Sequence, residues 1–160
     1  ILININNEIK VESKKNMKYA YKIGQQYEKK EEEITTNWFS GKGWTCTPTT
    51  LVEHYDFTVE KGNLKYLIET KVRWNITDIY DTLYLNVDKV NYLKEISKEK
   101  NMDFIVFYAF PKENIVYLIT ENNINQSKIK EIHVHNPAKG DRVEKNYIIN
   151  KSTLQKRKLQ

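Results

Sequence analysis

Two acidic residues and a lysine occupy positions that a predicted hairpin would bring together. Residues 54–60 and 65–73 alternate between apolar and polar side chains, and Gly62-Asn63 between them is typical of a two-residue turn. If the hairpin closes symmetrically on this turn, residues whose numbers sum to 125 lie opposite each other. This register predicts that Asp56 lies directly opposite Glu69.

Two carboxylates that face each other repel one another unless a cation lies between them. Because side chains alternate along a strand, Glu69 and Lys71 share a face with Asp56, whereas Ile68 points to the opposite, apolar face. Magnesium prefers hard oxygen ligands and usually keeps several waters. We therefore predict a Mg²⁺ or Mn²⁺ site built from Asp56, Glu69 and the Thr70 carbonyl. In this site Lys71 positions an attacking water or offsets charge on a phosphate.

The elements around this hairpin follow from apolar spacing and from turn residues. A helix is predicted over residues 17–40, ended by the pair Gly41 and Gly43. Residues 44–50 are rich in Thr and aromatic side chains and contain Pro48, which favours a short edge strand.

Downstream, residues 73–86 form a polar and aromatic connection without a clear pattern. Apolar residues at helical spacing predict a helix over 88–100, and continuous apolar runs predict buried strands at 104–110 and 115–120.

The last part of the chain has weaker signals. A short helix is predicted over 125–130, and a final hairpin joins 132–135 to 147–150 around Lys139-Gly140. The element order predicts an α/β sandwich around a mixed sheet. We expect one domain over residues 1–160, with a core at about 17–120 and a C-terminal β extension with a basic tail at 121–160.

Composition narrows the class of protein. A single cysteine, Cys46, excludes an internal disulfide, and no His/Cys cluster has zinc-site spacing. No run approaches the roughly 18 to 20 apolar residues of a membrane span. These features predict a cytoplasmic or intracellular protein that does not act in a membrane. The abundance of Asn, Lys, Ile and Tyr indicates an AT-rich coding sequence, which favours a bacterial cell or a phage-infected host.

The net charge of +5 is concentrated near the C-terminus. Residues 139–160 hold seven Lys and Arg residues against two acidic ones, which accounts for the whole excess. Such a segment attracts a polyanion, and we expect Arg157 and Lys158 to bind nucleic acid. A solvated, frayed terminus is the alternative.

The pattern of Asp56, twelve residues and then Glu69-Thr70-Lys71 resembles the motif of the PD-(D/E)XK nuclease superfamily. Tyr55 stands where the motif name has proline. The core of that superfamily is a restriction-endonuclease-like helix, three strands, a helix and a further strand, the order inferred above. The resemblance also implies that Glu28, on the first helix, is a fourth catalytic and metal-binding residue.

The resemblance implies an enzyme that hydrolyses nucleic-acid phosphodiester bonds with Mg²⁺ or Mn²⁺, with DNA favoured over RNA. The superfamily includes restriction endonucleases, repair and recombination nucleases, and Holliday-junction resolvases, which act as dimers. A homodimer is therefore one expectation. The alternative from another class is a non-catalytic module that keeps the nuclease fold and binds nucleic acid or a protein partner, and an assembly protein with an incidental Glu-Thr-Lys strand is a second.

Further residues have two interpretations each. Arg73 continues the face of Glu69 and could grip a phosphate, and the resemblance places Lys89 of the second helix near the site; surface positions are the alternative for both. His54 could touch substrate or metal, or lie on the surface, and we expect His133 and His135 to be structural or exposed. The three tryptophans and eleven tyrosines stack on unpaired bases or pack in the core.

Overall fold

The computed structural model describes residues 26, 28–49, 56–138 and 140–160. The chain divides into two compact units, residues 1–34 and 35–160. In the first unit residues 28–34 are helical, in agreement with the apolar spacing. The helix continues to Gly41 in the second unit and ends in a turn at Gly43, whose φ of 86° suits glycine.

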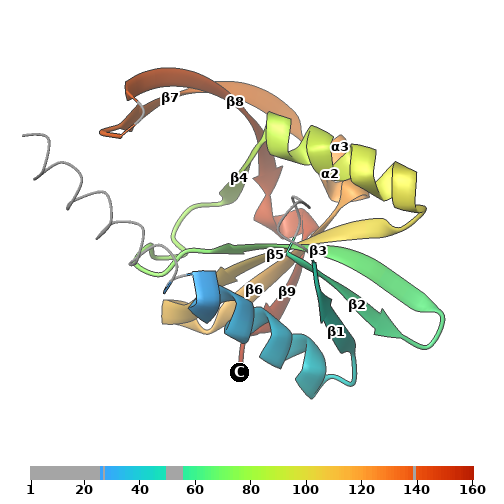
Figure 1. Ribbon diagram of the computed structural model, residues 1–160. Helices are drawn as coiled ribbons and strands as arrows, with labels where there is room; N and C mark the ends of the chain where they lie inside the picture. Colours follow the sequence, from blue (N-terminus) through green and yellow to red (C-terminus); the bar gives the residue numbers. More distant parts are fainter. Residues whose placement is uncertain (1–25, 27, 50–55, 139) are drawn as a thin grey trace, which may run out of the picture. The chain divides into compact units, whose positions relative to one another are not determined.

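A six-stranded mixed sheet forms the centre of the second unit (Figure 1). Its strand order is β1-β2-β3-β5-β6-β9. Only the β3–β5 pair is parallel among these neighbours. The strands are β1 (Thr45–Pro48), β2 (Phe57–Lys61), β3 (Leu64–Val72), β5 (Asp103–Phe110), β6 (Ile115–Thr120) and β9 (Gln155–Lys158).

A second sheet has the order β4-β8-β7, with β4 (Thr82–Asn86), β8 (Gly140–Asn150) and β7 (Lys128–Asn136). β4 pairs with residues 146–150 of β8, and among the described residues no third strand pairs with the distal part of the β7–β8 hairpin. We call residues 131–138 and 140–145 the arm; Figure 1 shows it curving away from the rest of this sheet.

Two helices follow strands of these sheets. α2 (Val87–Lys100) begins where the Asn86 side chain accepts a hydrogen bond from the Lys89 N–H, and ends at Asn101 with a φ of 51°. It buries Val90 and Leu93, as the predicted apolar stripe requires. α3 (Glu121–Asn125) is a single short helix. Short 3₁₀ turns occupy Pro111–Glu113 and Lys151–Thr153.

The six-stranded sheet is buried on both faces. On one face Leu67, Val106 and Tyr117 pack in a core that includes residues of α2, β4 and β8. On the other face Trp38 and Phe39 of the first helix pack against Phe107, with ring centroids 5.5 and 5.8 Å apart. This two-sided burial explains why β5 has a continuous apolar sequence.

Three predictions about the chain downstream of β3 were wrong or incomplete. The connection 73–86 contains β4. The predicted helix at 125–130 lies instead at Glu121–Asn125, because Thr120 and Asn123 form a capping box there, and residues 128–130 already belong to β7. The last hairpin is longer than predicted, and its register pairs Ile132 with Glu144. No helix in the described part of the chain is long and apolar enough to cross a membrane.

Candidate metal and phosphate site

The β2–β3 hairpin has the predicted register. Its pairs run from Phe57 and Ile68 to Lys61 and Leu64, and Gly62 in the turn has a φ of 60°. Asp56 directly precedes β2, and its backbone N–H donates to the Ile68 carbonyl at 3.0 Å. The pairing of β2 with β3 thus places Asp56 beside Glu69, as the turn symmetry predicted.

A hydrogen bond to the backbone fixes the Asp56 side chain. Its Oδ2 accepts from the Thr70 N–H at 2.5 Å. The Thr70 hydroxyl in turn donates to the buried Thr35 hydroxyl at 3.1 Å, which ties β3 to the second unit's part of the first helix. The acidic side chain is therefore held by an element that is itself anchored.

Glu69 is the acidic residue of the site whose pKa is clearly shifted. One carboxylate oxygen, Oε1, lies 3.1 Å from the Lys89 ammonium. The other, Oε2, is buried and has no hydrogen-bond partner among the described residues. Burial, and then the neighbouring charge of Asp56, raise the pKa of Glu69 to about 7, although Lys89 and Lys71 oppose the shift. A half-satisfied buried carboxylate beside a second acid is the environment that a hard cation would stabilise.

Lys71 lies further along the same face of β3, opposite Tyr108 of β5. Its ammonium is 5.6 Å from the centre of the Tyr108 ring and 3.5 Å from the Tyr84 carbonyl of β4. Burial, and then Arg73, lower the pKa of Lys71 to about 8, while Glu69 and Glu144 act in the opposite direction. The amine therefore loses its proton far more readily than an exposed lysine.

Arg73 follows the end of β3 and extends this row. Its backbone N–H donates to the Ala109 carbonyl at 2.9 Å, and its Nε donates to the Tyr108 hydroxyl at 3.0 Å. Within the described residues, no hydrogen bond or ion pair engages its two terminal nitrogens. The guanidinium is thus oriented with donors left for an anion.

Comparisons with known proteins address the fold. No family model and no curated protein matches the sequence. Among solved structures, Hjc from Archaeoglobus fulgidus, a Holliday junction resolvase from an archaeal hyperthermophile, matches with a TM-score of 0.51. The alignment has 17% identity and covers 75% of this chain and 88% of that chain. The chain has a restriction-endonuclease-like fold. The predicted fold class is confirmed, and the resemblance to the PD-(D/E)XK superfamily holds at the level of architecture.

Other predicted residues belong to the first unit, to the arm or to the part of the chain outside the description. Glu28 is an exposed helical residue of the first unit, and its ligand role stays a prediction. His54 and Tyr55 lie outside the described residues. His133 and His135 are exposed on the arm, where the Nδ1 atom of His135 hydrogen-bonds to the Asp141 carboxylate. No group of three or more His, Cys, Asp or Glu side chains with metal-site geometry occurs in the described ranges.

The basic tail is an ordered edge strand of the restriction-endonuclease-like sheet. In β9, Arg157 pairs with Val116 and Lys158 pairs with Ile115, so alternation sends their side chains to opposite faces. A cross-strand row that sequence reasoning missed runs from Lys71 through Tyr108 and Tyr117 to Lys156. At the usual strand spacing Lys156 is about 14 Å from β3 on the site face.

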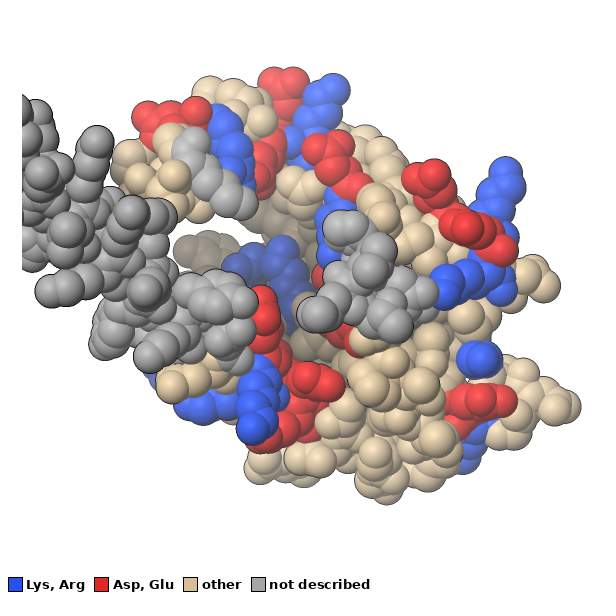
Figure 2. Space-filling model, in the orientation of Figure 1, with Lys and Arg blue, Asp and Glu red and all other residues tan. Residues whose placement is uncertain are grey.

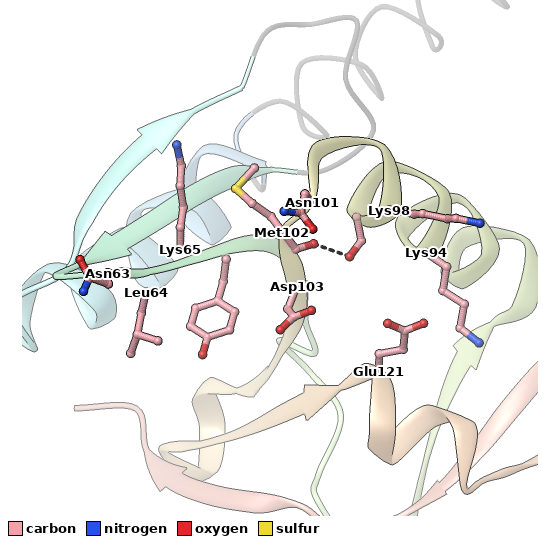
Figure 3. A pocket seen from close by; sticks show the side chains of 11 residues that line it. Asn63, Leu64, Lys65, Lys94, Lys98, Asn101, Met102, Asp103 and Glu121 are labelled. Carbon is pink, nitrogen blue, oxygen red and sulfur yellow. Dashed lines mark hydrogen bonds between the residues drawn. The ribbon is translucent and has the colours of Figure 1, made fainter.

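A hollow of about 640 Å³ lies at the opposite end of β3 and contains none of the predicted site residues (Figure 3). Its charged side chains are mixed, with Lys65, Lys94 and Lys98 alongside Asp103 and Glu121. This mixture offers no concentrated field for a polyanion. A smaller hollow has a volume of about 470 Å³. Arg73 and Tyr108 line it, so it adjoins the β2–β3 hairpin with Asp56 and Glu69.

Proposed function

We propose that this chain is a divalent-metal-dependent nuclease of the resolvase type that hydrolyses phosphodiester bonds, with DNA as its substrate. The observation that carries the proposal is the buried Oε2 of Glu69 beside Asp56, an atom that has no hydrogen-bond partner in the described part of the chain, with Lys71 on the same strand face. The likeness to Hjc supports it through the fold.

The residues of the hairpin fit a hard cation. Asp56 and Glu69 would bind Mg²⁺ or Mn²⁺ with the Thr70 carbonyl, and Glu28 is a further proposed ligand. Lys89 now neutralises one Glu69 oxygen at 3.1 Å, so its ammonium marks a position where positive charge is already favoured. When bound, the ion would lower the pKa of a water and screen the phosphate charge.

Lys71 would act as the general base of the reaction. With a pKa near 8, a substantial fraction of the amine is neutral at slightly alkaline pH. The neutral amine can accept a proton from the attacking water as its oxygen bonds to phosphorus and the ester P–O bond breaks. Arg73 would hold a non-bridging phosphate oxygen through its terminal nitrogens.

The charge distribution agrees with a polyanionic substrate. The net charge is +5, and Lys156 shares the sheet face of Lys71. Figure 2 shows basic side chains within the hollowed side of the molecule below the arm. We propose DNA because Hjc is a resolvase of Holliday junctions; a homodimer and an intracellular setting are parts of the same proposal.

Cleavage of defined DNAs tests the proposal. Plasmid, linear duplex, single-stranded and four-way-junction DNA would be incubated with the full chain in Mg²⁺, Mn²⁺ or EDTA. We expect cleavage in either metal and none in EDTA. Lys71→Ala should reduce cleavage by about 10²- to 10⁴-fold and keep DNA binding within about twofold of wild type. Binding without cleavage in the wild-type protein would instead identify a non-catalytic module.

A further inference from the structure

We propose that the hollow next to Arg73 is a subsite for an unpaired nucleobase, so that the enzyme prefers DNA with an unpaired nucleotide beside the cleaved phosphate. This inference rests on the proposed nuclease function and names its substrate class. The hollow has a volume of about 470 Å³, within the usual range of roughly 300 to 1,000 Å³ for small-ligand pockets.

The subsite is continuous with the candidate site. Tyr84 and Tyr108 line the hollow, and both also contact Lys71, through the Tyr84 carbonyl at 3.5 Å and the Tyr108 ring at 5.6 Å. Arg73 lines the hollow as well and donates to the Tyr108 hydroxyl. A phosphate held by Arg73 would therefore have its own base or its neighbour's base within reach of this hollow.

The walls suit a planar aromatic ligand. The lining combines Tyr80, Tyr84, Tyr108 and Phe110 with the aliphatic side chains of Ile76 and Leu83. Stacking on aromatic side chains is the main way in which proteins hold unpaired bases without sequence preference. The guanidinium of Arg73 and the aromatic walls together match a nucleotide better than an apolar ligand or a peptide.

Exposed apolar side chains are concentrated in and beside this hollow. Ile76, Ile79, Tyr80 and Tyr84 are 45, 70, 66 and 40% exposed, and Ile79 is the one of the four that does not line the hollow. They are half of the eight large apolar side chains that are exposed in the described chain, and they fall within nine residues. Concentrated apolar exposure of this kind marks a binding surface.

Contacts of Asp78 and Lys151 hold the connection that carries these side chains. Asp78 forms a buried ion pair with Lys151 and accepts a hydrogen bond from the Tyr117 hydroxyl at 2.7 Å. The Lys151 ammonium also donates to the Tyr80 carbonyl, and the Lys151 N–H donates to the Asp81 carbonyl at 2.9 Å. Lys151 thus holds the backbone at Tyr80 and Asp81, next to the exposed Tyr80 side chain.

Two exposed tyrosines give a matched test. Tyr84→Ala and Tyr80→Ala would be compared with Tyr92→Ala, since Tyr92 on α2 is also 40% exposed and does not line the hollow. The probe is a splayed-arm duplex with 2-aminopurine as the first unpaired base, in Mg²⁺, with Lys71→Ala as the background that prevents cleavage.

We expect the fluorescence of this base to be quenched on binding. Tyr84→Ala or Tyr80→Ala should weaken binding of the splayed DNA by about 5- to 100-fold, the range for loss of one stacking contact. Binding of plain duplex should change less than twofold, and Tyr92→Ala should change neither. Equal effects of the Tyr84 and Tyr92 substitutions, or equal loss on duplex and splayed DNA, would overturn the subsite.

Cleavage by the otherwise wild-type chain separates this inference from the function on which it rests. Faster cleavage of splayed or flapped DNA than of duplex, lost in Tyr84→Ala, supports both. Cleavage that is equally fast on duplex and splayed DNA supports the nuclease and overturns the subsite. Quenching that depends on Tyr84, without cleavage of any DNA, supports the subsite and overturns the nuclease.

Discussion

The Asp56 carboxylate accepts a hydrogen bond from the backbone N–H of Thr70, the residue that directly follows Glu69 in the chain. This contact lies just beyond the Phe57–Ile68 pair, which ends the β2–β3 ladder. Beyond that pair a side chain, instead of the backbone, accepts the hydrogen bond from β3. The contact holds two acidic groups side by side, and the charge of Asp56 adds to burial, the larger cause, in raising the pKa of Glu69.

The stability of the metal-free protein should fall as pH rises through the range in which Glu69 ionises. Its pKa is raised from 4.5 to about 7, so its contribution to folding is fully present below 4.5 and is lost as pH rises through 7. Glu69→Gln removes this penalty. Urea unfolding in EDTA should show the variant more stable by about 1 to 3 kcal/mol at pH 8 and nearly unchanged at pH 4.5.

Glu60→Gln is the control for this experiment, because Glu60 is exposed on the neighbouring strand and faces Lys65. The same substitution there should have no comparable pH-dependent benefit. An equal effect of Glu69→Gln at both pH values would show that Glu69 is not destabilised by its surroundings.

The register of the hairpin was predictable because its information is local. A Gly-Asn turn and two alternating runs determine which residues face each other, and the observed pairs agree with the turn symmetry. β4 was missed although Leu83 and Leu85 alternate as buried residues, because its partner β8 lies about sixty residues downstream. The position of α3 depended on the Thr120 capping box, which was overlooked.

The rest of the site could not be read from the sequence because it comes from several elements. Tyr108 of β5, Tyr84 of β4 and Glu144 of β8 surround Lys71, and none lies near it in the chain. Lys89 was placed near the site by family resemblance, but its contact with Glu69 is visible only in three dimensions. Non-local packing of this kind leaves no periodic signal.

Lys71→Ala should reduce single-turnover cleavage by about 10²- to 10⁴-fold, the usual range for loss of a proton-transfer group. The wild-type rate should rise between pH 6 and 8, because the pKa of Lys71 is lowered to about 8 and the neutral amine accepts the proton. Lys65→Ala, at the exposed start of the same strand, is the control and should retain the wild-type rate. A Lys71 variant that cleaves at the wild-type rate would remove this residue from the chemistry.

Lys89→Gln should tighten Mg²⁺ binding. The Lys89 ammonium occupies Glu69 Oε1 at 3.1 Å, and a divalent ion has to compete with it. For a partly exposed pair the competition amounts to about 1 kcal/mol, so we expect roughly fivefold tighter binding by calorimetric titration. Lys98→Gln on the same helix should leave the affinity unchanged, and weaker binding in Lys89→Gln would contradict the competition.

Asp78→Asn should destabilise the fold by about 3 kcal/mol, since it removes the carboxylate that pairs with the largely buried Lys151 ammonium. Asp81→Asn, an exposed neighbour, should cost less than about 0.5 kcal/mol. Chemical unfolding monitored by tryptophan fluorescence measures both. If the two variants were equally stable, the Asp78–Lys151 pair would not be what holds the connection before β4.

The shared cation is the central claim, and Mn²⁺ binding measured by electron paramagnetic resonance tests it most directly. The full chain, Asp56→Asn and Glu69→Gln would each be titrated with Mn²⁺ under identical conditions. We predict one tightly bound ion per wild-type chain and its loss in both variants, each of which still folds. Undiminished Mn²⁺ binding in the two variants would contradict the claim that Asp56 and Glu69 bind one metal ion together.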